Sequence, residues 1–175
     1  MTLLIRPAET ATEFAALYAM RELMAVWDMA MTKEAGLDPM DTFNAFYTAG
    51  AESLRETYER QGTCILLARS DDQVIGSAGY SPLEQDRNGT TAEVEKFYVA
   101  EKARGKGVGR VLLLDVLARM PADGYRHACL ETVTFMTAAI TLYRAHGFAT
   151  CAPFRPAPPR LESVTVFMHR ALQDG

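Results

Sequence analysis

The sequence predicts an α/β fold in which helices flank one mixed sheet. Three observations support this class: helical periodicity over the first 60 residues, three consecutive strand-like segments between residues 62 and 99, and alternating helical and strand-like segments from residue 108 onward. The resulting order, βααβββαβαβ, is typical of helices packed on a sheet. With 175 residues and 49% hydrophobic content, the chain is expected to form a single domain over residues 1–175.

The first third of the chain is expected to be one strand followed by two helices. Residues 3–6 (LLIR) read as a short strand that Pro7 ends. Residues 10–33 carry an apolar stripe at steps of three and four, formed by Phe14, Leu17, Met20, Met24, Trp27 and Met31. The stripe favours core packing, although methionines that face a ligand would show the same spacing. After the breaker AGLDP, residues 40–60 predict a second helix.

The middle of the chain is predicted to be an antiparallel meander. Residues 62–70 and 74–80 are β-branched and apolar without helical spacing, and the DDQ turn between them indicates a hairpin. The polar segment 81–90 contains an Asn-Gly reversal and leads into a third strand at residues 91–99. Three strands joined by short polar turns pair in sequence order.

The last third alternates between helix and strand. Residues 108–120 are apolar around most of the helix and stop before Pro121, which predicts a largely buried helix. A strand at 127–132, a helix at 137–148 ended by Gly147, a Pro-rich loop at 152–160 and a final strand at 163–172 complete the chain.

Composition and charge exclude several classes of function. The net charge of −4 and the pI near 5.4 argue against a partner that is a nucleic acid. No apolar run approaches the roughly 20 residues that a membrane span requires, and the N-terminus lacks the layout of a signal peptide. We therefore expect a cytoplasmic protein with no membrane partner.

The cysteines and histidines give no metal-site or disulfide pattern. Cys64 and Cys129 lie in apolar runs and are expected to pack in the core, whereas Cys151 could be a nucleophile but has no base beside it. The three histidines have no metal-ligand spacing. No metal is expected.

The segment RGKGVGR, residues 104–110, is the strongest local signal for a ligand. Its three glycines permit unusual backbone conformations, and it precedes a predicted helix whose first N–H groups and dipole attract an anion. The positive charge is supplied by Lys102, Arg104, Lys106 and Arg110. The chain has no Walker A string, and the dinucleotide fingerprint fails because Arg110 replaces its last glycine. A phosphate-bearing ligand is the remaining hypothesis, beside a solvated glycine-rich turn.

The segment VEKFYVAEKARGKGVGRVLL resembles the acyl-CoA-binding segment of the GNAT superfamily of acetyl-CoA-dependent N-acyltransferases, with Arg104, Gly107 and Gly109 matching the pattern Gln/Arg-x-x-Gly-x-Gly/Ala. LETVTFMTAAITLYRAHGF resembles the later strand and helix of that family. The resemblance implies a mostly antiparallel mixed sheet, acetyl-CoA as acyl donor, pyrophosphate binding by loop N–H groups, and pantetheine pairing with the preceding strand. The cofactor-binding residues it implies are Phe97, Tyr98, Val99, Arg104, Gly105, Lys106, Gly107, Val108, Gly109 and Arg110.

Acetyl transfer to an amine requires a base for the amine and an acid for the departing thiolate. The resemblance implies Tyr143 as the acid, although a tyrosine on an apolar helix face also simply packs. It implies Glu93 as a candidate base, with Glu95 as a second. Strict alternation would place both glutamates, Phe97 and Val99 on one face of the strand. The alternatives are a water chain as base, or glutamates that flank the acceptor site or pair with cations such as Lys96.

The predicted function is therefore transfer of an acetyl group from acetyl-CoA to a primary amine of a small molecule or peptide, by direct attack in a ternary complex. The alternative is a non-catalytic acyl-CoA-binding or sensing protein on the same fold. The sequence singles out no particular acceptor. Homodimers are common in the family the segment resembles, so a homodimer is left open.

Overall fold

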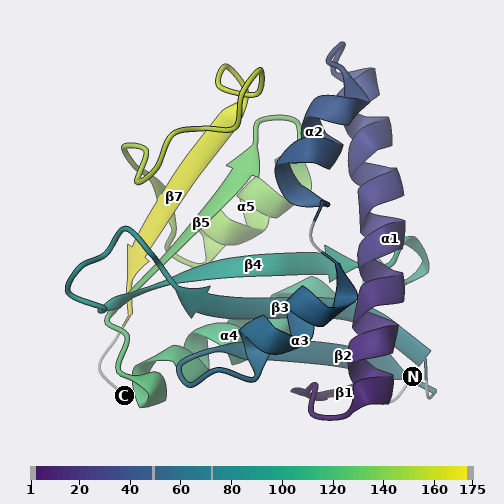
Figure 1. The fold of residues 1–175 in the computed structure, drawn as a ribbon, viewed down its shortest axis with the longest axis vertical. Helices are drawn as coiled ribbons and strands as arrows, with labels where there is room; N and C mark the ends of the chain where they lie inside the picture. Colours follow the sequence, from purple (N-terminus) through teal and green to yellow (C-terminus); the bar gives the residue numbers. More distant parts are fainter. Residues whose placement is uncertain (1–2, 49, 72, 173–175) are drawn as a thin grey trace.

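The computed structural model describes residues 3–48, 50–71 and 73–172, which form one seven-stranded sheet with helices on both faces (Figure 1). Its order is β1-β2-β3-β4-β5-β7-β6, in which β4 and β5 pair in parallel and all other neighbours are antiparallel. The mostly antiparallel mixed sheet and the predicted meander are thus confirmed. The strands are β1 Leu3–Pro7, β2 Cys64–Ser70, β3 Gln73–Pro82, β4 Thr91–Val99, β5 His127–Val133, β6 Ala149–Thr150 and β7 Thr165–Ala171.

The long helix α1, Ala11–Glu34, begins at a capping box. The Thr10 hydroxyl accepts from the Glu13 backbone N–H, and the Glu13 carboxylate accepts from the Thr10 backbone N–H at 3.0 Å. These two bonds satisfy N–H groups that the first turn of a helix leaves open. The predicted start near Thr10 is confirmed.

The single helix predicted over residues 40–60 is wrong. The structure has two helices there, α2 Pro39–Phe46 and α3 Ala51–Tyr58. Gly50 is the N-cap of α3, a position that suits glycine far better than a helix interior does. Tyr47 ends α2, and its buried side chain donates a hydrogen bond to the Asp28 carboxylate on α1.

Helices cover both faces of the sheet, so the central strands are buried on both sides. Figure 1 shows α1, α2 and α3 in front of the sheet and α4, Val108–Arg119, behind it. On β2, Ile65 and Leu67 join the cluster beneath α1 and α3, whereas Leu66 and Ala68 join the larger cluster that includes α4. The helix α5, Thr137–Ala145, contributes Tyr143 to this larger cluster.

The C-terminal elements follow the prediction with three differences. Helix α5 ends at Ala145 instead of residue 148, and the two-residue β6, which pairs with β7, was not predicted because two residues carry no periodic pattern. Helix α4 is less buried than expected, with Val111 and Leu114 exposed on its outer face. Within the described ranges, no helix is both long and apolar enough to cross a membrane.

Candidate active site

The site is created where β4 and β5 separate. Across the described residues the two strands pair only from Thr91 to Glu93 on β4 and from His127 to Cys129 on β5, and Figure 1 shows them spreading apart beyond this point. A cavity of about 390 Å³ opens between them. Its walls come from the second half of α1, from α2, from β4 and β5, and from the start of α5.

A bulge in β4 changes which side chains face this cavity. Gly79 pairs with Glu95 and Ser77 with Tyr98, so Ala78 alone stands opposite two residues, and Lys96 has a φ of 53°. The bulge reverses the alternation of side chains along the strand. The prediction that Glu93, Glu95, Phe97 and Val99 share one face is therefore wrong: Phe97 and Val99 pack against the cluster that holds Ala92 and Val94.

The glycine-rich loop ends at the N-terminus of α4 with its N–H groups uncapped. Gly107 is the N-cap, with a φ of 80° and no side-chain cap. A Cβ at Gly107 would meet nothing within 4 Å, so it is the dihedral angle that requires glycine there. The first backbone N–H groups of α4, from Val108 to Arg110, have no carbonyl one turn earlier in the helix.

Charges around the loop fit a diphosphate. Lys102, Lys106 and Arg110 are exposed beside the uncapped N-terminus, where the helix dipole adds partial positive charge. Lys106 Nζ donates to the Lys102 carbonyl at 2.8 Å. The Val108 side chain, by contrast, is buried in the core at 1% exposure, so only its backbone is available to a ligand.

Arg104 fixes the position of the loop. Its guanidinium lies over the Trp27 ring at 4.1 Å from the centroid, and its Nε donates to the Val99 carbonyl at 3.0 Å. The Arg104 guanidinium carbon also lies 5.7 Å from the centroid of the Tyr98 ring. The side chain therefore ties the loop to α1 and to the end of β4.

Tyr143 lies in the cavity wall on α5. Its ring makes edge contacts with Phe97, at 5.6 Å between centroids, and with Phe148, at 5.9 Å. Burial, with the charge of Asp28 adding to it, raises the pKa of the Tyr143 hydroxyl above its usual value. The hydroxyl is thus protonated at neutral pH, as a general acid must be.

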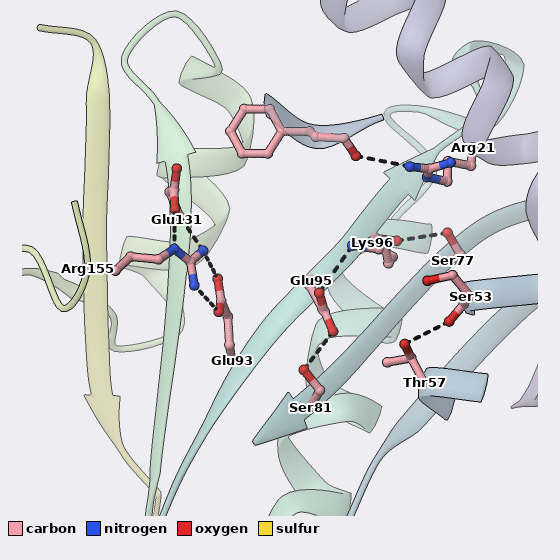
Figure 2. A network of polar contacts seen from close by, with 11 residues as sticks. Arg21, Ser53, Thr57, Ser77, Ser81, Glu93, Glu95, Lys96, Glu131 and Arg155 are labelled. Carbon is pink, nitrogen blue, oxygen red and sulfur yellow. Dashed lines mark hydrogen bonds and ion pairs between the residues drawn. The ribbon is translucent and has the colours of Figure 1, made fainter. Parts of the chain in front are cut away.

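The two glutamates named from the sequence are both engaged by cations (Figure 2). Glu95 accepts from Ser81 at 2.8 Å and pairs with Lys96 at 3.1 Å. Although burial opposes the shift, Lys96 and Ser81 hold the pKa of Glu95 below its usual value. Both oxygens of Glu93 accept from the Arg155 guanidinium, at 2.5 and 2.6 Å.

Arg155 joins Glu93 to a further carboxylate, Glu131 on β5. Arg155 Nε and Nη2 lie 2.9 and 2.7 Å from Glu131 Oε2. We call these three residues the Glu93–Arg155–Glu131 cluster; all three line the cavity. Sequence reasoning missed Arg155 and Glu131, because they come from a Pro-rich loop and a strand 24 positions apart.

Asp28 and its neighbours on α1 were also missed. Asp28 accepts a hydrogen bond from the Tyr47 hydroxyl, and burial raises its pKa to about 6 although Tyr47 and Arg104 oppose the shift. Met24, Trp27 and Met31 line the cavity beside it, so the core interpretation of the apolar stripe holds for Phe14, Leu17 and Met20 only. A carboxylate within such a stripe is the sequence signal that could have identified Asp28.

The cysteines are poorly suited to nucleophilic attack. Burial raises the pKa of all three thiols, Cys64, Cys129 and Cys151, which disfavours the reactive thiolate. In the described part of the chain, no three His, Cys, Asp or Glu side chains gather as metal ligands. The reactive groups of the cavity are therefore carboxylates and tyrosine.

Comparison with known proteins identifies the architecture. The acetyltransferase (GNAT) family model matches residues 23–148, which include the loop, the separated strands and Tyr143. The chain belongs to the GNAT acetyltransferase family. By family it is an acyltransferase, and the resemblance of residues 93–148 to this family is confirmed.

Two acetyltransferases match this chain over part of their length. The IAA acetyltransferase of Azospirillum brasilense is 32% identical over 117 residues, 67% of this chain and 73% of that protein. N-acetyltransferase 8B of Rattus norvegicus is 28% identical over 63% of this chain and 50% of that protein, so this chain spans about half of that relative.

Solved structures share the fold over nearly the whole chain. A GCN5-related N-acetyltransferase from Kribbella flavida has a TM-score of 0.70 and 25% identity, covering 97% of this chain and 98% of that one. The structure of yncA from Salmonella typhimurium, solved with its cofactor acetyl-CoA, has a TM-score of 0.71 and 20% identity, covering 99% and 95% of the two chains.

Proposed function

We propose that this protein transfers an acetyl group from acetyl-CoA to a primary amine. The observation that carries the proposal is that a loop suited to a diphosphate adjoins a cavity that contains an acid and carboxylates. The loop before α4 adjoins the cavity, because Arg104 lies over Trp27 and Gly109 packs close to Phe97, and both Trp27 and Phe97 line the cavity. The cavity holds Tyr143, Asp28 and the Glu93–Arg155–Glu131 cluster.

Acetyl-CoA fits the residues present. The N–H groups from Val108 to Arg110 would hold the pyrophosphate, with Lys106 nearby, and the free edge of β4 beyond Glu93 would hydrogen-bond the pantetheine amides. The bound molecule supplies a thioester carbonyl that an amine can attack. Phe97 and Val99 would contact the cofactor from the cluster side, on which α4 lies.

Two residues of the cavity match the proton transfers. Asp28 would accept a proton from the amine as it attacks the carbonyl carbon, and Tyr143 would donate a proton to the sulfur as the carbon–sulfur bond breaks. We assign the base to Asp28 in preference to Glu93 or Glu95 because Arg155 and Lys96 already engage those two carboxylates. Its pKa of about 6 leaves Asp28 ionised at neutral pH and close to the range in which a base works best.

A panel of primary amines tests the proposal. Purified protein with acetyl-CoA should release free thiol only when an accepted amine is present, and mass spectrometry should find the acetylated amine. Independently, acetyl-CoA at 100 times its Kd should stabilise the protein by about 2.7 kcal/mol. Stabilisation without thiol release on any amine would indicate a binding protein, and no stabilisation would refute the proposal outright.

A further inference from the structure

The Glu93–Arg155–Glu131 cluster leaves one buried carboxylate oxygen without a partner. Among the described residues, no group hydrogen-bonds to Glu131 Oε1, and the Glu131 side chain is only 5% exposed. Figure 2 shows one Glu131 oxygen turned to Arg155 and the other turned away from it. A buried acceptor without a donor costs about 1–3 kcal/mol, so this oxygen marks a place for a ligand donor.

The donors of Arg155 are almost used up. A guanidinium has five N–H groups. Nε and Nη1 each make one bond within the cluster, and Nη2 contacts both Glu93 Oε1 and Glu131 Oε2. Arg155 therefore has one N–H left, on Nη1, and cannot also bind the carboxylate of an amino acid in a two-bond pairing.

The cluster is also unbalanced in charge. Two carboxylates face one guanidinium in a cavity wall with side chains 5% to 29% exposed, so the cluster is negative when all three groups are ionised. Burial and the charge of Glu93 raise the pKa of Glu131 although Arg155 opposes the shift, and a bound cation would favour the ionised form. A buried charge of this kind requires a partner of opposite sign. A neutral hydroxyl would satisfy the oxygen but not the charge, whereas an ammonium group satisfies both.

We propose that Glu131 Oε1 binds a second, non-reacting ammonium group of the acceptor, so that the preferred substrates are diamines. One ammonium donates to Glu131 while the other nitrogen, deprotonated, attacks the thioester between Asp28 and Tyr143. This assignment rests on the proposed acetyl transfer and adds the acceptor class to it. Acceptors with a carboxylate beside the amine are disfavoured, because they would face Glu93 and Glu131.

The test compares 1,4-diaminobutane with n-butylamine, which has the same carbon chain and no second ammonium. Native protein should show kcat/KM at least tenfold higher for the diamine. Glu131→Gln keeps the shape and the contact with Arg155 but removes the charge, and should lower kcat/KM for the diamine by about 10- to 100-fold, the range of a charged hydrogen bond. The loss of kcat/KM for n-butylamine should be about tenfold smaller, because this amine has no second ammonium for Glu131 to bind.

The exposed Glu162→Gln is the matched control, because it makes the same chemical change outside the cavity. It should leave both amines unaffected. Titration calorimetry of 1,4-diaminobutane into native protein saturated with coenzyme A gives a readout without turnover, and Glu131→Gln should abolish the heat. A melting temperature of Glu131→Gln close to native would show that folding is intact.

The outcomes separate the two proposals. Equal kcat/KM for both amines in native protein, or an equal loss for both in Glu131→Gln, overturns the diamine assignment and leaves acetyl transfer standing. Protein that binds acetyl-CoA but acetylates neither these amines nor any other on the panel overturns both.

Discussion

The role of Asp28 can be tested through the pH dependence of turnover. Its pKa of about 6 means that most of Asp28 is ionised at pH 7 and most is protonated at pH 5. If Asp28 is the base, kcat/KM for the deprotonated amine should fall about tenfold between these two pH values. The measurement is kcat/KM for the amine at saturating acetyl-CoA, which reports the enzyme before the amine binds, calculated on the concentration of deprotonated amine so that protonation of the free amine does not enter.

Asp28→Asn removes the base while keeping a partner for Tyr47, because an amide oxygen still accepts from the Tyr47 hydroxyl. We expect kcat at pH 8 to fall by about 10²- to 10⁴-fold, and the acid limb near pH 6 to disappear. Glu22→Gln, an exposed change of the same kind on the same helix, is the control and should retain both rate and limb.

Tyr47→Phe gives a readout that a purely structural role would not produce. The Tyr47 hydrogen bond lowers the pKa of Asp28, so its loss should raise that pKa and move the acid limb to higher pH. An acid limb that persists unchanged in Asp28→Asn would show that another group titrates and would refute the assignment.

Three further changes test the acid, the loop and the first helix. Tyr143→Phe keeps the ring contact with Phe97, so the melting temperature should change little. If Tyr143 is the acid, kcat should fall by roughly 10²-fold or more. Unchanged turnover across pH would remove Tyr143 as the acid. In Gly107→Ala the ligand-free loop can relax from its left-handed dihedral, and returning to that dihedral on binding costs about 1–2 kcal/mol. Calorimetry should therefore show coenzyme A binding about 5- to 30-fold weaker. The control Gly36→Ala, at a glycine with the same φ of 80°, should leave binding unchanged. Backbone hydrogen bonds at Glu9 and Thr10, with Arg6 nearby, lower the pKa of Glu13 to about 2, so ionised Glu13 stabilises the fold fully above about pH 4.5 and loses that effect as pH falls toward 2. Denaturation at several pH values should therefore find Glu13→Gln about 1 kcal/mol less stable at pH 7, with the difference shrinking as pH falls below 4.5 and vanishing only below about pH 2.

The parts of the fold that depend on local pattern could be predicted from the sequence. The capping residue Thr10, the meander and the glycine-rich turn before α4 each arise from neighbours within a few positions, and the structure has all three. The break between α2 and α3 was missed although Gly50 is a local signal for it, and tertiary contacts also favour it. Tyr47 leaves the helix to reach Asp28, and the Phe46 carbonyl accepts from Arg21.

In the candidate site too, the parts formed by neighbouring residues could be predicted and the parts formed by distant residues could not. The glycine-rich loop is contiguous in sequence and could be recognised there, whereas the cavity wall around the Glu93–Arg155–Glu131 cluster is assembled from distant segments. Glu93 and Arg155 are 62 positions apart, and the bulge at Lys96 that turns Phe97 away from Glu93 has no periodic signature. A strand read with strict alternation cannot reveal a bulge, because one extra residue reverses every side chain beyond it.

The glycine-rich loop and the cavity wall carry opposite charge. The positively polarised N-terminus of α4, with Lys102, Lys106 and Arg110, favours an anionic ligand beside the cavity, whereas the Glu93–Arg155–Glu131 cluster makes part of the cavity wall negative when its three groups are ionised. In the proposed reaction, the polyanionic donor would be attracted to the loop and a cationic acceptor to the cluster, and each would be repelled from the other place. Because like charges placed together are costly, this separation would order the two proposed substrates on opposite sides of the thioester without any contact specific to the acetyl group.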